Sequence, residues 1–448
     1  MLITRNPRRD AVEILYQVLF KGATSTQLIS EALQQYDNFM DARLLNNIVL
    51  GTLRRYLTLK SVLEMISDRP VGRIQPIVQC IIYTGLFQLL FLDRIPPHSA
   101  VNEAVKIAKA LKRKSAGFVN ALLRRAAREK GKLIDNIGRL PLEVRVSIPQ
   151  YLIKQMHKAL KEAPSIQLLE ALNAPSVTYM RVNLSLISRE DFVQRLLSKG
   201  IEVKPAEFTR GGVVMSQGTM LSTLGIVPHL ALPQDLASQL VVEVLNPEPG
   251  ERIADLCAGR GIKTTQILEY TGDQAEVWAV EINQQKLQSL KELARARRVS
   301  NFRQIRADAG MWHPRLLFDK VLLDAPCTGS GTIQRRPEVR YRISEKDLKI
   351  VELQKALLKN AVRLTKPGGL IVYAVCSFFQ QEGPEVTASV IRELGDLVEE
   401  VDIKLPYRDF PFKKGGKISI IPGFAPMDGF FIALLKRNVD GPATTVQK

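Results

Sequence analysis

The C-terminal half of the chain contains five successive segments that are typical of buried strands, and each one leads directly into a chemically reactive polar residue. The segments span 252–256, 277–280, 302–307, 318–323 and 370–375. The residues that follow them are, in the same order, Cys257, Glu281, Asp308, Asp324 and Cys376. Short apolar runs indicate buried strands, and open α/β sheets bind ligands at the carboxyl ends of their strands. This regularity predicts an α/β domain with one ligand site along an edge of its sheet.

The fourth of these strands ends abruptly at Asp324-Ala325-Pro326-Cys327. Proline cannot donate to a sheet ladder, so the strand must stop there, and two glycines then follow within four residues. A carboxylate and a thiol therefore share one strand end. A turn that contains these two residues by chance would have the same local sequence, so the motif gains its meaning from the other strand ends.

The loop after the first strand predicts a nucleotide-like cofactor. Its glycines let a ligand approach the backbone closely, and Glu281, a little over twenty residues on, suits the two hydroxyls of a ribose. The order of a P-loop is absent, which disfavours NTP hydrolysis, and nothing suits hydride transfer. S-adenosylmethionine explains more, with its ribose on Glu281, its adenine near Asp308 and its methionine end near Asp324. The candidate cofactor-binding residues are Cys257, Ala258, Gly259, Arg260, Gly261, Ile262, Lys263, Glu281, Asp308 and Asp324.

The first 142 residues have helical apolar spacing and a strong excess of positive charge. They hold 22 Lys and Arg against 11 Asp and Glu, a net +11 of the chain's +18. An excess of one sign on this scale favours an RNA partner over a merely solvated surface. The candidate RNA-contacting residues here are Lys112, Arg113, Arg124 and Arg125.

Four further arginines are candidate RNA contacts outside this region. Arg181 ends a predicted strand, where a structural salt bridge is an equal alternative. Arg335, Arg336 and Arg340 follow the Asp324 loop, where they can grip phosphates or pair with nearby glutamates.

The four cysteines, Cys80, Cys257, Cys327 and Cys376, form no C-x-x-C pair. We therefore expect no metal site and no disulfide framework, and free thiols suit a reducing cytoplasm. The N-terminal segment is basic but lacks the apolar stretch of a secretory leader, and no apolar run reaches about 18 residues, so no membrane association is expected.

Two resemblances extend these predictions. The blocks Leu50-Gly51-Thr52-Leu53-Arg54, Gly85-Leu86-Phe87-Gln88-Leu89, Ile95-Pro96-Pro97-His98 and 118–124 resemble the NusB antitermination factor family, a helical RNA-binding fold. Residues 233–437 resemble the RNA cytosine-C5 methyltransferases in the blocks 233–240, 257–263, 324–331, 373–377 and 427–431. With both parts together, the chain resembles the RsmB (Sun/Fmu) family of small-subunit rRNA methyltransferases. Two positions depart from that family: Gly259-Arg260-Gly261-Ile262-Lys263 replaces Ala-Pro-Gly-Gly-Lys, and Val375 replaces Thr.

The resemblance implies roles for three residues. Carbon 5 of cytosine is a poor nucleophile, and a thiolate that adds to carbon 6 activates it for methyl transfer. In the family, the cysteine at Cys376 attacks, the cysteine at Cys327 assists release, and Asp324 bonds the cytosine edge. Residue chemistry alone leaves the two thiols unassigned, because DNA cytosine methyltransferases attack with the Pro-Cys thiol, which here would be Cys327.

The predicted architecture is therefore multidomain. An all-α NusB-like domain spans 1–142, a helical connector with a small α+β RNA-binding insert spans 143–228, a Rossmann-like class I methyltransferase domain spans 229–437, and a flexible tail spans 438–448. The predicted activity is S-adenosylmethionine-dependent cytosine-C5 methylation of small-subunit (16S) rRNA by a cytoplasmic monomer. A tRNA cytosine-C5 methyltransferase and a non-catalytic RNA-binding assembly factor are the alternatives.

Overall fold

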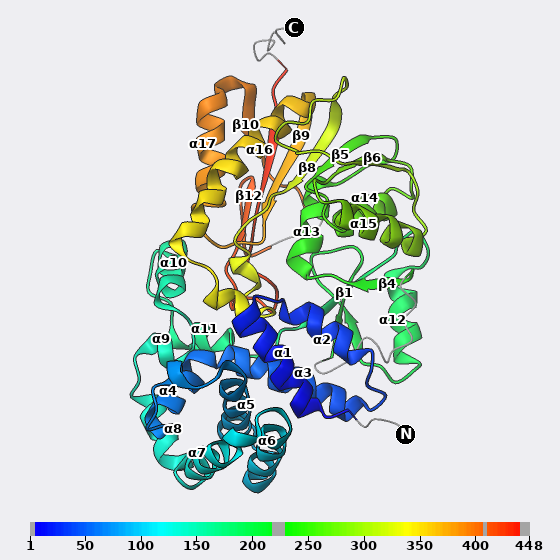
Figure 1. Cartoon of the computed structure of the whole chain (residues 1–448). Helices are drawn as coiled ribbons and strands as arrows, with labels where there is room; N and C mark the ends of the chain where they lie inside the picture. The colour runs from blue at the N-terminus through cyan, green and yellow to red at the C-terminus, as the bar shows by residue number, and fades with distance from the viewer. Residues whose placement is uncertain (1–4, 217–228, 406–409, 440–448) are drawn as a thin grey trace.

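The computed structural model describes residues 5–216, 229–405 and 410–439. The helices of the N-terminal third form one end of the molecule, and the large sheet with its helices forms the other (Figure 1). Residues 217–228 of the predicted insert and 440–448 of the predicted tail lie outside the described residues.

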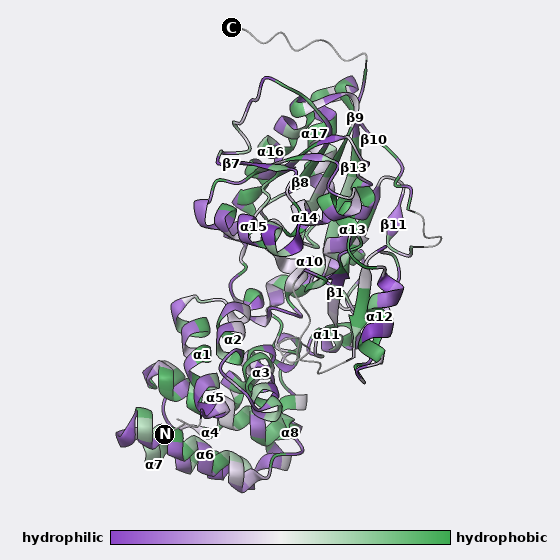
Figure 2. Cartoon of the chain, turned by 90° about the vertical axis from the view of Figure 1, so that its right-hand side faces the viewer, coloured by the Kyte–Doolittle hydropathy of each residue, from purple (hydrophilic) through white to green (hydrophobic). Residues whose placement is uncertain are grey.

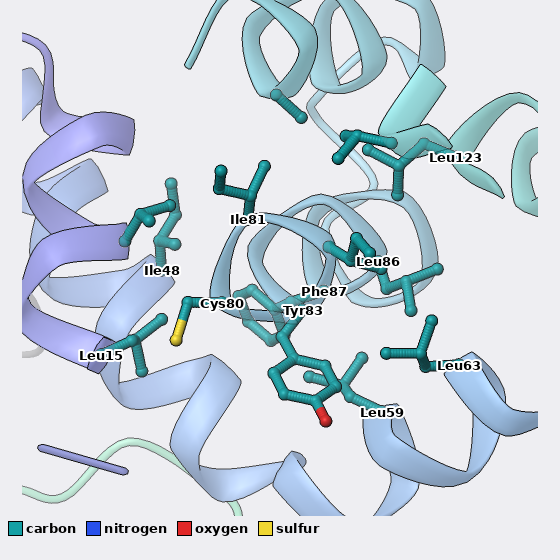
Figure 3. Close-up of a cluster of buried hydrophobic side chains, with 14 of the residues drawn as sticks. Leu15, Ile48, Leu59, Leu63, Cys80, Ile81, Tyr83, Leu86, Phe87 and Leu123 are labelled. Carbon is teal, nitrogen blue, oxygen red and sulfur yellow. The ribbon is translucent and has the colours of Figure 1, made fainter. Parts of the chain in front are cut away.

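The N-terminal part is helical, as predicted. Its helices are α1 (Pro7–Lys21), α2 (Ser25–Leu33), α3 (Phe39–Arg54), α4 (Tyr56–Ile66), α5 (Pro76–Phe91), α6 (Pro97–Leu111) and α7 (Ala116–Arg128). Helix α5 is apolar on almost every face, so it forms the centre of the bundle. In Figure 3 the α5 side chains, among them Cys80 and Tyr83, pack against Leu15 of α1, Ile48 of α3 and Leu123 of α7.

Four short helices connect this bundle to the rest of the chain. They are α8 (Lys130–Gly138), α9 (Leu142–Arg145), α10 (Gln150–Leu160) and α11 (Ile166–Ala171). Leu152 and Met156 of α10 share one apolar core with Ile333 and Phe379, which follow the two predicted cysteine loops. The connector therefore packs beneath the region where the reactive thiols are expected.

The small insert is an antiparallel sheet with one helix on its face. Its elements are β1 (Thr178–Val182), α12 (Arg189–Leu197), β2 (Val203–Pro205), β3 (Gly212–Met215) and β4 (Ala231–Pro233), with strand order β2-β3-β1-β4 among the described residues. The Ile201 amide donates to the carbonyl of Leu196, so Ile201 belongs to the turn that ends α12 and β2 begins at Val203.

The C-terminal part is a mixed sheet between two layers of helices. Its strands are β5 (Arg252–Leu256), β6 (Glu276–Val280), β7 (Phe302–Ile305), β8 (Phe318–Asp324), β9 (Thr365–Val375), β10 (Val398–Glu400), β11 (Lys413–Lys414), β12 (Lys417–Ile420) and β13 (Phe430–Arg437). Its helices are α13 (Leu236–Leu245), α14 (Ile262–Tyr270), α15 (Gln284–Arg297), α16 (Ile350–Leu364) and α17 (Pro384–Leu394). Strands β7, β6, β5, β8 and β9 run parallel in that spatial order, and β13 continues the sheet antiparallel to β9.

Alternate residues of the strands serve the two faces of this sheet. Ile253 and Leu322 pack with α13 and α14, whereas Ala254 and Val321 pack with α16 and α17. Figure 2 shows strands β8 and β13 mostly in the hydrophobic colour, as expected for a sheet covered on both faces. The chain reverses its direction of travel across the sheet between β5 and β8, which is where such folds bind their ligands.

Helix α13 and strand β7 set the limits of the site. All but one of the residues of α13 are buried, so it is a core helix. The third strand, predicted to run to 307, ends at Ile305, because β6, its partner among the described residues, ends opposite at Val280. Asp308 therefore lies three residues beyond the strand that it was expected to close.

Candidate active site

The loop between β5 and α14 makes an unusually tight turn. Cys257 has a left-handed backbone with φ of 63°, which is uncommon for a residue with a side chain and marks strain. Gly261 has φ of 83°, and a Cβ atom there would lie 2.5 Å from the side chain of Leu290. This loop therefore depends on glycine at 261, although it lacks the Pro-Gly-Gly order of the resembled family.

A pocket of about 280 Å³ opens beside this loop. Its walls are Pro233, Gln234, Asp235, Ser238, Asp255, Cys257, Ala258, Gly259, Arg260, Ile262, Lys263, Asp324 and Arg335. Most of the predicted cofactor-binding residues line it, but Gly261, Glu281 and Asp308 do not. The pocket thus joins the loop after β5 to the end of β8.

Glu281 sits at the end of β6 and touches the same loop. Its buried carboxylate accepts hydrogen bonds from the Gly259 amide at 3.0 Å and the Asn283 amide at 2.9 Å. Ile282, the next residue, is an exposed apolar side chain. Asp308 is also exposed and accepts a bond from the Gly310 amide. The acidic residue after β6 is therefore bonded to the loop, whereas Asp308 accepts its bond from Gly310, two residues further along the chain.

Lys263 and Asp324 form an ion pair across the pocket. Their Nζ and Oδ2 atoms lie 2.5 Å apart, and the ammonium also lies over the ring of Phe430. Lys263 is nearly buried, so the pair connects the first turn of α14 firmly to the end of β8. Because a buried lysine needs a partner, the pair is a structural requirement of this site.

Asp255 is a pocket residue that the sequence reasoning missed. Its side chain is buried, its Oδ2 accepts a bond from Thr264 at 2.5 Å, and its Oδ1 has no hydrogen-bond partner. Burial raises the pKa of this carboxyl to about 7. An acidic residue inside an otherwise apolar strand was the available signal. The orphaned oxygen marks a place where a bound molecule can donate a hydrogen bond.

Asp235 is a second missed residue on the opposite wall. It caps α13 and accepts bonds from the amides of Ala237 and Asp428. Burial, together with the nearby Asp428 carboxylate, raises the pKa of Asp235 to about 7. Arg335 forms an ion pair with Asp428, so a buried acidic group and a guanidinium face the pocket together.

The two remaining cysteines predicted for the site, Cys327 and Cys376, lie side by side. Cys327 follows β8 and Cys376 follows β9, which are adjacent parallel strands, and their sulfur atoms lie 3.3 Å apart with one thiol donating to the other. The hydrogen bond with Cys376 is the largest cause of a raised pKa of Cys327, followed by burial. Neither sulfur lines the pocket, but Asp324 does, three residues before Cys327.

Two predicted RNA contacts are wrong because the side chains are buried. Arg181 is fully buried and forms an ion pair with Glu269 at 3.1 Å, which is the structural alternative considered for it. Arg340 is fully buried as well, and its guanidinium donates to the carbonyl groups of Ile333 and Leu172. Both arginines stabilise the contacts between parts of the chain and are not available to phosphates.

The other basic candidates lie at the surface. Lys112, Arg113 and Arg124 are exposed on one end of the helical bundle. Arg125 is half-buried against Glu129, and Arg336 lies 3.9 Å from Glu338. These positions remain predictions as RNA contacts.

Within the described ranges, no cluster of three or more His, Cys, Asp or Glu residues is arranged to hold a metal ion. In the same part of the chain, no helix combines the length and the apolar character that crossing a membrane requires.

Comparison with known proteins places the chain. The family described as 16S rRNA methyltransferase RsmB/F matches residues 242–436, the NusB family matches 5–128, and the ferredoxin-like domain of RsmF/B-like methyltransferases matches 148–221. The probable ribosomal RNA small subunit methyltransferase B of Synechocystis sp. is 31% identical over 96% of this chain and 99% of its own length. The chain belongs to the RsmB/F methyltransferase family.

Other relatives agree with this membership. The ribosomal RNA small subunit methyltransferase B of Klebsiella pneumoniae is 32% identical over 97% of this chain and 99% of its own. The crystal structure of a methyltransferase homolog protein from Pyrococcus horikoshii is 27% identical, with a TM-score of 0.57 over 66% of this chain and 97% of its own. The structure of PH0851 shares the fold over 97% of this chain and all of its own, with a TM-score of 0.79 at 23% identity. The chain is thus an S-adenosylmethionine-dependent methyltransferase by family.

Proposed function

We propose that this methyltransferase modifies carbon 5 of a cytosine in small-subunit rRNA through a covalent bond between Cys376 and the base. The observation that supports this most is the pair of thiols, 3.3 Å apart, at the ends of two neighbouring parallel strands. One thiol can attack carbon 6 while the other assists the later release, and we assign the attack to Cys376 by the family resemblance.

The residues around the pocket fit S-adenosylmethionine. Glu281 would hold the ribose hydroxyls, and the exposed Ile282 offers an apolar surface to the adenine. The unpartnered Oδ1 of Asp255 offers an acceptor for the ammonium group at the methionine end. When bound, the cofactor supplies a methyl group on a positively charged sulfur.

The protein residues then have separate roles in the reaction of the cytosine ring. Cys376 would add to carbon 6, which makes carbon 5 nucleophilic enough to accept the methyl group. Asp324, held by Lys263, would bond the cytosine edge. After transfer, a base must remove the carbon 5 proton so that the bond between Cys376 and carbon 6 can break, and we assign help in this release to Cys327. The cytosine must leave its stack to reach these groups.

The substrate RNA would be held mainly by the basic end of the helical bundle. Lys112, Arg113 and Arg124 are exposed there, and Arg335 lies beside the pocket with Arg336 next to it. Relatives named as small-subunit rRNA methyltransferases match the chain over nearly its full length, which supports rRNA over tRNA. The match to the NusB family at residues 5–128, ahead of the catalytic part of the chain, also supports an rRNA substrate.

The test uses the full-length purified protein. It is incubated with S-adenosylmethionine and either an unmodified 16S rRNA transcript or a tRNA pool, and the products are mapped by bisulfite sequencing. We expect one protected cytosine in 16S rRNA, none in tRNA, and none with Cys376→Ala. Protection in tRNA alone would support the tRNA alternative. Titration calorimetry that shows no cofactor binding, together with RNA binding, would support a non-catalytic assembly factor.

A further inference from the structure

Glu382 is a buried carboxylate with an unusual set of contacts. It lies in the turn between β9 and α17, and its side chain is fully buried. Among the ion pairs of the described part of the chain, none involves Glu382. A buried charge without a cation is costly, so it persists only where hydrogen bonds to the carboxylate are strong and complete.

The donors to this carboxylate come from both cysteine loops. Thr328, which follows Cys327, donates its amide at 2.8 Å and its hydroxyl at 2.5 Å. Ser377, which follows Cys376, donates its hydroxyl at 2.8 Å. The two oxygens of Glu382 thus join the residue next to one thiol to the residue next to the other.

A third element completes the arrangement. Gln354 of α16 donates its side-chain amide to Glu382 at 3.1 Å and to the carbonyl of Pro326, the residue before Cys327, at 2.9 Å. Tyr373 of β9 donates its hydroxyl to the backbone carbonyl of Glu382 at 2.6 Å. Glu382 therefore joins both thiol loops to a strand and to a helix. It does so beside two direct bonds between the loops, from the Gly331 amide to the Cys376 carbonyl and between the Ser330 and Ser377 hydroxyls.

We propose that Glu382 is a positioning residue, which holds Cys327 and Cys376 at the separation that the reaction needs. The chemical meaning of this proposal rests on the proposed thiol mechanism. Hydrogen bonds to a carboxylate are about twice as strong as those between neutral groups, so a charged clamp sets the two loops more rigidly than a neutral one.

The other titratable groups around this cluster do not take over this role. Tyr373 and Tyr151 face Glu382 as neutral phenols, and Arg335 faces Cys376 from the pocket side while paired with Asp428. Among these titratable groups, Glu382 is the one that accepts hydrogen bonds from both cysteine loops.

The experiment compares the full-length wild type with Glu382→Gln. In the wild type, Oε1 of Glu382 accepts from the Thr328 and Ser377 hydroxyls, and Oε2 accepts from the Thr328 amide and from Gln354. An amide has one acceptor oxygen, so in Glu382→Gln one of these two pairs of donors faces an NH2 group instead. We expect kcat for methylation to fall about tenfold to a hundredfold, the range for a lost hydrogen bond to a charged group. KM for RNA and cofactor should stay within about twofold. The matched control is Glu243→Gln, which alters another buried carboxylate near the opposite end of α13 from the pocket and should leave kcat unchanged.

A second readout does not depend on catalysis. A mild thiol oxidant, diamide, is added without RNA, and disulfide formation between Cys327 and Cys376 is followed by peptide mass spectrometry. The wild type should form it quickly and Glu382→Gln at least several-fold more slowly. Alkylation of the buried Cys80 reports on general unfolding and should stay slow in both proteins.

The outcomes separate the two proposals. Wild-type kcat and wild-type disulfide formation in Glu382→Gln would overturn the positioning role, as would an equal loss of kcat in Glu243→Gln. If the wild type forms no methylated product at all, the proposed function fails, but the disulfide comparison still decides the positioning role. Where Glu382→Gln does not accumulate as folded protein, Thr328→Val removes one donor without changing the side-chain shape and should reduce kcat and disulfide formation in the same direction.

Discussion

The sulfur atoms of Cys327 and Cys376 lie 3.3 Å apart, each just beyond the end of one of two adjacent parallel strands. If Cys376 attacks and Cys327 serves release, their substitutions should differ. Cys376→Ala should abolish methylation and any covalent RNA adduct. Cys327→Ala should allow attack and methyl transfer but stall afterwards, so that protein remains crosslinked to RNA. A denaturing gel with a labelled rRNA fragment measures this, and an adduct with Cys376→Ala alone would reverse the roles.

Glu281 should affect cofactor binding more than the chemical step. Glu281→Ala removes a carboxylate that also anchors the Gly259 amide, so the affinity for S-adenosylmethionine should fall by about 1.5–3 kcal/mol, roughly tenfold to a hundredfold. Saturating cofactor should restore most of kcat. The control is Glu276→Ala at the other end of the same strand, where the carboxylate pairs with Arg252 and Arg303. Calorimetry that gives equal affinities for the two variants would assign Glu281 a different role.

Arg181 and Arg124 were both predicted as RNA contacts, and the structure separates them. Arg181→Ala should destabilise the fold by about 3–5 kcal/mol, because it leaves the buried Glu269 with Arg297 as its remaining guanidinium. Arg124→Ala should leave stability within about 0.5 kcal/mol but lower the slope of RNA affinity against salt by about one. Urea unfolding and filter binding at several salt concentrations measure both effects. A weaker salt slope with Arg181→Ala alone would contradict the burial argument.

These arginines show where sequence reasoning stops. The strand ends at Asp324 and Cys376 could be predicted, because short apolar runs and the order of parallel strands bring successive ends to one edge. The burial of Arg181 could not, because its partner Glu269 lies 88 residues away and an arginine is exposed in most proteins. The orphaned Oδ1 of Asp255 depends in the same way on packing that no local pattern reports.

Asp255 gives a prediction for pH. Burial raises its pKa to about 7, whereas an aspartate in an unfolded chain titrates near ~3.9. Between these values the native protein binds more protons than the unfolded chain. The stability contributed by the neutral carboxyl is therefore fully present below about pH 4 and is lost as the pH rises to about 7. Asp255→Asn keeps an acceptor for Thr264 but cannot ionise, so its unfolding free energy should fall less over this range. If urea unfolding gave the same dependence of unfolding free energy on pH for both proteins, this prediction would be wrong.

The segment that follows the cysteine loop gives the last prediction. Its Tyr341 hydroxyl donates to the carbonyl of Leu53 in α3 at 2.7 Å and lies 3.0 Å from the Ser147 hydroxyl. Glu338 of the same segment accepts two bonds from Ser25 of α2. Glu338 and Tyr341, seven and ten residues after Gly331, therefore contact the helical bundle, and we predict that the bundle affects kcat as well as RNA affinity.

Tyr341→Phe should test this connection without altering surface charge. Loss of the hydroxyl leaves the buried Leu53 carbonyl without this donor, which should cost about 1–3 kcal/mol of stability. Because the segment continues directly from the loop of Cys327, kcat should fall while the salt slope of RNA binding stays the same. The control is Tyr16→Phe in α1, whose ring stacks on Phe20. A mechanical link between α3 and the catalytic loop predicts a lower kcat with unchanged RNA binding. If Tyr341→Phe instead weakened RNA binding and left kcat intact, the bundle would act through affinity alone.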